Sequence, residues 1–160
     1  MLKACSTGIR LMIAFTLLAS MTAGVNGGVP STPVRGEQAL REAEQITAMN
    51  PHWEVVRGQG HSMTPYFGEH SLLLVDRSTG GALRPGTVML YRDRDGDLIA
   101  HKVVGTDDNL LIAQGLNNTN VDPAPVPRDA VEGVVFGVLH TSGIGEYARD
   151  LPVVTGKTWK

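Results

Sequence analysis

From residue 53 onward, apolar residues fall in short runs that are separated by clusters of glycine, proline, aspartate and asparagine. Short runs of this kind, rich in β-branched residues and bounded by turn-forming residues, are typical of β-strands. Because no helical pattern lies between the runs, they predict a small, mostly β domain with antiparallel strands. Asp95-Gly96 predicts a tight hairpin between the third strand and the fourth. The six expected strands are Trp53–Val56, Ser71–Val75, Thr87–Tyr91, Leu98–Val104, Leu110–Ala113 and Val131–Leu139.

Ahead of the strands, Glu37–Met49 has a different period. Its apolar positions recur at helical spacing and are Ala39, Leu40, Ala43 and Ile46. We expect one short N-terminal helix that ends before Asn50-Pro51, because the residue preceding a proline disfavours the helical conformation. Residues 26–52 are therefore expected to form a linker and a short helix. Residues 141–160 mix glycine with charge and predict a loosely attached C-terminal tail.

The first residues of the chain have the pattern of a targeting segment. Lys3 and Arg10 precede the uncharged apolar run Leu11–Ala23, and small and turn-forming residues follow it. This order is typical of a secretory signal. The run is shorter than the roughly 20 residues that span a bilayer, but uncharged residues continue to Val34. Residues 1–25 are therefore predicted to be a signal peptide or a membrane anchor. We expect an exported protein, either anchored through residues 11–25 on the extracytoplasmic side or secreted or periplasmic.

Composition narrows the classes of function. The chain has 160 residues, enough for one domain, and its net charge of −2 gives no electrostatic reason to expect a nucleic-acid partner. A single cysteine excludes a disulfide framework within the chain and a cysteine-built zinc site. The five histidines match no usual ligand spacing, and Arg92–Asp97 lacks the complete calcium-loop pattern. We therefore expect no metal and no cofactor, and interpret Arg92–Asp97 as a solvated hairpin.

The candidate chemistry begins at Gly58–Pro65, a glycine-rich approach to a serine that a proline-containing turn follows. Such a turn can present the Ser62 hydroxyl outward, although an ordinary loop would have the same composition. Serine is a weak nucleophile until a neighbouring base takes its proton. Two basic residues, His101 and Lys102, lie next to each other in a predicted strand. Because neighbours on a strand point to opposite faces, only one of them can face Ser62.

Several blocks follow one another in the order found in a known family. They are Ser62–Pro65, Gly68-Glu69, Pro85–Val88, His101–Val104, Gly115–Asn118 with Asp122-Pro123, and Gly133–Val135. Over about residues 53–139 the chain resembles the type I signal peptidases, most closely the endoplasmic-reticulum and archaeal branch. The resemblance implies a catalytic domain at 53–140 with the fold that this family shares with LexA-type proteases. It also implies that Ser62 is the nucleophile, His101 the general base and Asp122 the acid that supports the base, with Lys102 as the alternative base.

On this resemblance we expect a serine endopeptidase that cleaves exported or membrane-associated polypeptides through an acyl-enzyme and acts as a monomer. A LexA-like protein that cleaves itself, at Ala23-Gly24 or Gly80-Gly81, is an alternative. An inactive binding or structural member of the fold is another. It is suggested by departures from the family pattern: Gly60 in place of a serine that helps to stabilise the oxyanion, His61 in place of glycine and Leu116 in place of aspartate.

The residues just before and after the serine are candidates for binding the substrate. The first strand could be an edge strand that pairs with an extended substrate, and it could equally be a plain core strand. Met63 is expected to lie buried beneath the serine, and His61 to shape the substrate groove. The expected substrate-binding residues are Val55, Val56, Gln59, Gly60 and Met63.

Overall fold

The structure is a computed structural model that describes residues 28, 32–78 and 83–159. The predicted signal or anchor at residues 1–25 lies outside these residues, and so do both candidate self-cleavage bonds, Ala23-Gly24 and Gly80-Gly81. Within the part that is described, none of the helices has the length and apolar character needed to cross a membrane.

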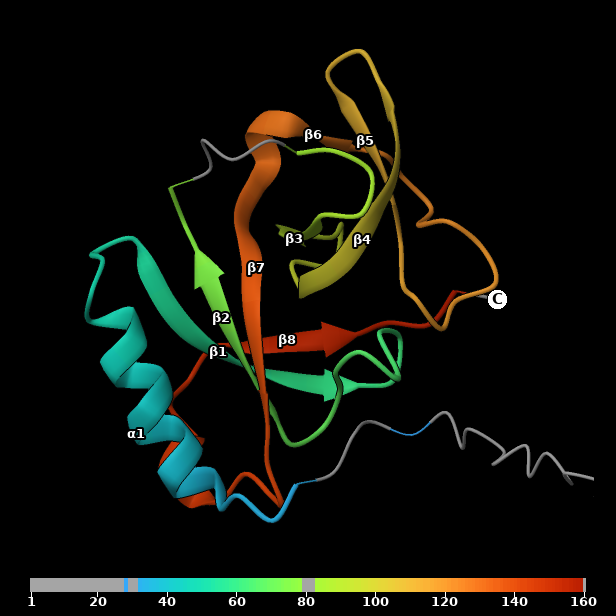
Figure 1. Cartoon of the computed structure of the whole chain (residues 1–160). Helices are drawn as coiled ribbons and strands as arrows, with labels where there is room; N and C mark the ends of the chain where they lie inside the picture. The colour runs from blue at the N-terminus through green and yellow to red at the C-terminus, as the bar shows by residue number, and fades with distance from the viewer. Residues whose placement is uncertain (1–27, 29–31, 79–82, 160) are drawn as a thin grey trace, which may run out of the picture.

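A single eight-stranded sheet forms the body of the protein, with the strand order β6-β5-β4-β3-β7-β2-β1-β8. The sheet is strongly curved, so that β4 and β5 lie opposite the ends of β1 and β8 (Figure 1). The mostly β class is confirmed, and all six expected strands are present. The strands are β1 (Trp53–Gly60), β2 (Ser71–Asp76), β3 (Val88–Arg92), β4 (Leu98–Asp107), β5 (Leu110–Gln114), β6 (Val126–Pro127), β7 (Val131–His140) and β8 (Val153–Gly156). The predicted hairpin joins β3 to β4, which pair antiparallel.

The C-terminal part of the chain differs from the expectation in two ways. Residues 141–160 were expected to be a loosely attached tail, but within them β8 adds to the sheet beside β1. The two strands run parallel, and Arg57 pairs with Val153 and Gly60 with Gly156. The sheet is therefore mixed, and the prediction of a purely antiparallel domain is wrong at this pair. Val154, in the middle of β8, is 1% exposed, so its burial in the core holds the strand in place.

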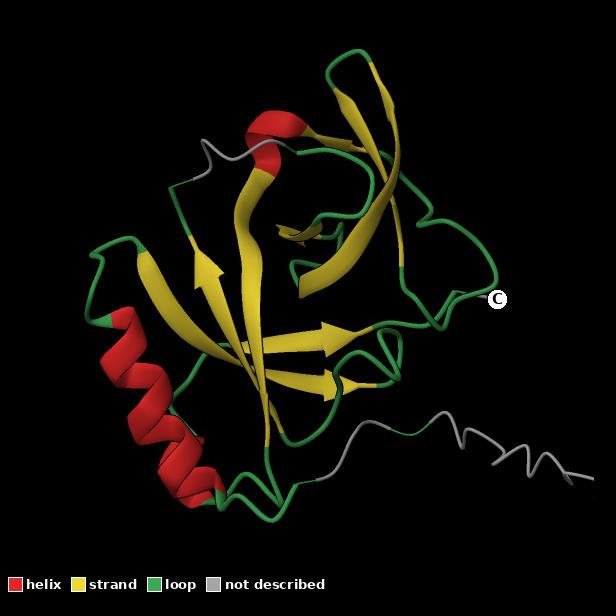
Figure 2. Cartoon of the chain, viewed as in Figure 1, coloured by secondary structure: helices red, strands yellow, loops and turns green. Residues whose placement is uncertain are grey.

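The expected helix is α1 (Gly36–Thr47), and it ends before Pro51. Figure 2 shows it in red, lying on one side of the strands. Its apolar face packs against the first two strands of the sheet, where Ala39, Leu40 and Ala43 meet Val55 and Leu72. The helical spacing of the apolar residues thus gives α1 one apolar face, and this face covers the first two strands of the sheet.

Two further hydrophobic clusters fill the inside of the curved sheet. One contains Val56, Met63 and Leu90, and it fixes the end of β1 and the turn that follows. The other contains Met89, Ile99 and further residues from β3, β4 and β5. Together they hold three places in the chain close to one another: the turn after β1, the middle of β4 and the loop after β5.

Candidate active site

Ser62 lies in the turn that leaves β1. Gly60, the last residue of the strand, has a φ of +85°, a conformation that glycine adopts without the steric cost that a Cβ imposes. The turn closes when the Thr64 amide donates to the His61 carbonyl at 3.1 Å, while Met63 is buried beneath it as expected. From the other side, the Asn117 amide donates to the Ser62 carbonyl at 2.7 Å. The serine is thus held on a rigid support at the edge of the core.

His101 reaches Ser62 from the middle of β4. Its Nε2 lies 2.9 Å from the Ser62 Oγ, and both residues are buried, His101 completely. The two positions are brought together by the fold, since 39 residues separate them in the chain. Lys102, the next residue of β4, lines a recess of about 420 Å³ together with Met63 and Val88. Of the two adjacent basic residues, the one that faces Ser62 is therefore His101.

Asp122 completes a chain of three side chains. Its amide donates to the Ala113 carbonyl at 2.8 Å, which fixes the loop after β5, and its carboxylate oxygens lie 2.9 and 2.8 Å from the His101 Nδ1. Because a carboxylate can only accept, Nδ1 carries the proton and donates it to Asp122. Nε2 is then the acceptor of the Ser62 hydroxyl, as a general base must be.

Tyr91 is a fourth member of this arrangement that the sequence did not indicate. Its hydroxyl donates to the Asp122 Oδ2. Burial, together with the hydrogen bond to the Asp122 carboxylate, raises the pKa of Tyr91 above its usual value, so the phenol stays protonated and donating. An aromatic residue in a strand normally indicates core packing, and nothing in the sequence pattern singles this one out. Tyr91 fixes the Asp122 carboxylate toward His101.

The expected substrate-binding residues do not lie on an open edge. The side chains of Val55 and Val56 belong to the core, at 6% and 0% exposure. Backbone positions 57–60 of β1, including Gln59 and Gly60, pair with β8. The expectation of a free edge strand is therefore wrong for this part of β1, because the chain's own β8 occupies it. Contact between any of these residues and a substrate stays a prediction.

The residues after β8 run directly past the candidate site. The Lys157 carbonyl accepts a hydrogen bond from the Asn118 side-chain amide at 3.1 Å. Two residues further on, the Trp159 ring lies edge-on to the His101 ring, with the ring centroids 5.4 Å apart. A recess of about 670 Å³ beside Asp122 is lined by Tyr91, Trp159 and the loop after β5. Neither Lys157 nor Trp159 was a candidate from the sequence, because both fell in the predicted tail.

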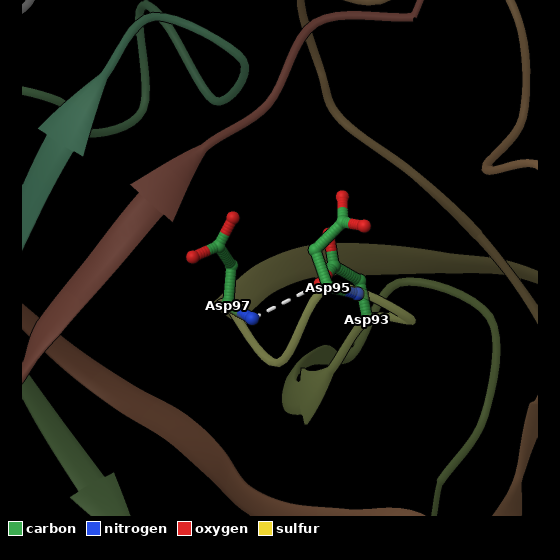
Figure 3. Close-up of side chains that lie close together, drawn as sticks. All are labelled: Asp93, Asp95 and Asp97. Carbon is green, nitrogen blue, oxygen red and sulfur yellow. Dashed lines mark hydrogen bonds between the residues drawn. The ribbon is translucent and has the colours of Figure 1, made fainter.

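Three carboxylates on the turn between β3 and β4 lie close enough together to hold a cation: Asp93, Asp95 and Asp97 (Figure 3). In the structure the cation that they bind is the Lys157 ammonium, which pairs with all three, at 2.8 Å from Asp95 and from Asp97. Hydrogen bonds to these carboxylates raise the pKa of Lys157, which therefore stays charged. Burial raises the pKa of Asp93, but the hydrogen bond from Lys157 and those from the backbone outweigh it and lower the pKa overall.

No protein-family model matches the sequence, and no curated protein matches it.

Proposed function

We propose that the protein is a serine endopeptidase in which Ser62 is the nucleophile, His101 the general base and Asp122 the acid that orients the base. The observation that carries the proposal is the continuous chain of hydrogen bonds from the Ser62 Oγ through the His101 ring to the Asp122 carboxylate. This arrangement, in which a base accepts the serine proton and a third group orients the base, activates a hydroxyl for acyl transfer.

The proposed reaction has two halves. The Ser62 oxygen attacks a peptide carbonyl while its proton moves to the His101 Nε2, and the Asp122 carboxylate stabilises the resulting imidazolium. His101 then gives this proton to the departing amine, and the C–N bond breaks, leaving an acyl ester on Ser62. In the second half, water attacks the ester with His101 again as the base, which releases a carboxylic acid and restores the serine. The chemistry needs no cofactor.

The order of the sequence blocks supports a specific substrate class. Their resemblance to the type I signal peptidases favours exported or membrane-associated polypeptides, and the targeting pattern at residues 1–25 favours an extracytoplasmic location. The alternative of an inactive binding protein gains no support from the site, because an inactive member has no need to keep a hydrogen-bonded serine, histidine and aspartate together. Nothing in the described residues favours the alternative of self-cleavage.

Two measurements test the proposal. The first is the labelling of the protein by a fluorophosphonate, in which the Ser62 oxygen forms a bond to phosphorus, fluoride leaves and His101 takes the proton; intact-mass spectrometry counts the adduct. The second is the cleavage of a peptide with the sequence of residues 15–32, which contains the predicted end of the signal. Ser62→Ala should abolish labelling, and both Ser62→Ala and His101→Ala should lower cleavage by about 10³-fold or more.

Two control variants separate the site from general effects. Ser142→Ala removes an exposed serine that lies beside the start of α1 and should leave labelling and cleavage unchanged. Lys102→Ala should keep substantial activity, because the base that bonds to the Ser62 Oγ is His101. Cleavage or labelling that persists in Ser62→Ala would contradict the proposal, and so would a Lys102→Ala variant that is inactive while His101→Ala is active.

A further inference from the structure

The contact between β8 and the end of β1 depends on two glycines that approach each other closely. A Cβ on Gly60 would lie 2.7 Å from the Gly156 carbonyl oxygen and 2.9 Å from its Cα. A Cβ on Gly156 would lie 2.7 Å from the Gln59 carbonyl oxygen and 2.9 Å from the His61 amide nitrogen. All of these neighbours are backbone atoms, which cannot rotate away. Because both residues are glycine, the backbone of β8 can lie directly against the residues that precede Ser62.

The segment beyond this contact is held at two points. At the first, the Lys157 ammonium binds the carboxylates of the β3–β4 turn while its carbonyl accepts from Asn118. At the second, Trp159 packs against His101 and the hydrophobic cluster of β3, β4 and β5. We call residues Gly156–Trp159 the closing segment. It runs from the backbone just before Ser62 to the ring of His101.

The burial of the site conflicts with the access that its proposed chemistry needs. Ser62 is only 1% exposed and His101 is 0% exposed. A substrate carbonyl must come to about 3–3.5 Å from the attacking oxygen before reaction. The Lys157 carbonyl is bound by Asn118 and the Trp159 ring lies against the His101 ring, so the residues after Gly156 occupy the approach to the base beside Ser62. A polypeptide cannot reach His101 from this side while the segment lies where the structure has it.

The chain is held more firmly before Gly156 than after it. Before it, Val154 is anchored in the core at 1% exposure. After it, the Lys157 side chain is 25% exposed, and of the carboxylates that it binds Asp95 is 78% exposed, Asp97 47% and Asp93 12%. Solvent-accessible ion pairs, such as those with Asp95 and Asp97, are weak and are screened by salt. The part after Gly156 is therefore held less firmly than Val154 and can leave the site while β8 stays in the sheet.

We propose that the closing segment is an intramolecular occupant of the substrate site, and that a polypeptide substrate reaches Ser62 only by displacing it. This inference rests on the proposed peptidase function, since it describes how that same site is opened. It assigns Lys157 as the tether and Trp159 as the group that covers His101, and neither residue takes part in the chemistry.

The test compares full-length variants in the fluorophosphonate and peptide assays described above. Lys157→Gln removes the tether and should raise the labelling rate and kcat/KM by about threefold to fivefold, the size expected for weak ion pairs. Trp159→Ala removes the cover and should raise both at least about tenfold. Lys157→Arg keeps the charge and should stay close to wild type. Arg149→Gln, which breaks an exposed ion pair with Glu146, and Tyr147→Ala, which removes an aromatic ring elsewhere, are the matched controls and should have no effect. Raising the salt concentration should accelerate the wild type and leave Lys157→Gln unchanged.

A second measurement does not depend on activity. Hydrogen exchange of the segment 58–66, followed by mass spectrometry in a Ser62→Ala background, should become faster when Trp159→Ala or Lys157→Gln is added. If these variants are labelled and cleave the peptide no faster than wild type while Ser62→Ala is inactive, the closing segment does not occupy the substrate site, and the peptidase proposal stands. If no variant is labelled or cleaves, the peptidase proposal fails, and faster exchange would still establish that the segment covers the Ser62 turn. Removal of the residues after Gly156 by Ser62 itself, seen in the intact mass, would overturn the inference, because the segment would then be a substrate.

Discussion

The hydrogen bonds around Asp122 allow a prediction that goes beyond the loss of a charge. Asp122→Asn keeps the size of the side chain but replaces one acceptor oxygen by an NH₂ donor. In the wild type, both the His101 Nδ1–H and the Tyr91 hydroxyl donate to the carboxylate. If the new carbonyl oxygen faces Tyr91, the NH₂ group faces Nδ1 and forces the ring proton onto Nε2. His101 can then no longer accept the proton of Ser62.

The magnitude follows from the geometry. The Asp122 side chain is 2% exposed and lies 2.8 Å from Nδ1, so its charge acts on the imidazolium at short range with little solvent between them. Two unit charges about 4 Å apart interact by about 4 kcal/mol at an effective dielectric constant near 20. Losing this stabilisation in the transition state would cost roughly 10³ in rate. The wrong tautomer can bring the loss to about 10⁴.

Tyr91→Phe supplies the test of this reasoning. Alone, it removes a donor to Asp122 and should lower kcat only severalfold. Combined with Asp122→Asn, it frees the asparagine to turn its oxygen toward His101, so the double variant should be more active than Asp122→Asn. The assay is single-turnover cleavage of the residue 15–32 peptide, with circular dichroism to verify folding. An Asp122→Asn variant within about threefold of wild type would refute the assigned role of Asp122, and a double variant less active than Asp122→Asn would refute the tautomer argument.

Two further predictions concern stability. Burial lowers the pKa of His140 below its ordinary value of 6.5, so the folded state binds fewer protons than the unfolded state. Stability should therefore fall as the pH drops from above 6.5 through the lower folded-state pKa. The decrease in Tm between pH 7.5 and 5.5 should be smaller in His140→Gln than in the wild type, and an equal decrease would contradict this cause. Gly156→Ala, whose Cβ would lie 2.7 Å from the Gln59 carbonyl oxygen, should lower the free energy of unfolding by roughly 1–3 kcal/mol in urea denaturation. Gly143→Ala, with no atom within 4 Å of the new Cβ, should change it by less than about 0.5 kcal/mol, and equal effects of the two changes would mean that the close approach is not the cause.

The sequence predicted those elements whose own residues carry a pattern. The helix and the six longer strands have a clear period, and they were found with boundaries within a few residues. β8 has only Val153 and Val154 as an apolar run, and its partner β1 lies almost one hundred positions earlier, so no local signal could indicate the pairing. β6 has only two residues, one of them a proline.

The candidate site divides in the same way. Ser62, His101 and Asp122 each stand in a recognisable block, and the alternation of side chains on a strand left one of two bases to face the serine. Tyr91 and Trp159 have no such block. Their relation to the site exists only through contacts between distant segments, the first across the sheet and the second through the unexpected strand β8. The open edge was expected because the sequence does not show which strand will lie beside β1.

The glycine at position 60 relates the position of β8 to the number of oxyanion donors at the proposed site. In the family that the sequence resembles, many members have a serine here that helps to stabilise the oxyanion, but in this chain its Cβ would collide with the backbone of Gly156. The missing donor and the close-lying strand are therefore one feature of the chain, and the two positions are epistatic. Moving β8 away should lower the cost of a serine at position 60, although its φ of +85° would still disfavour any side chain there. Attempts to improve the proposed catalyst by changing residue 60 alone should lose stability first.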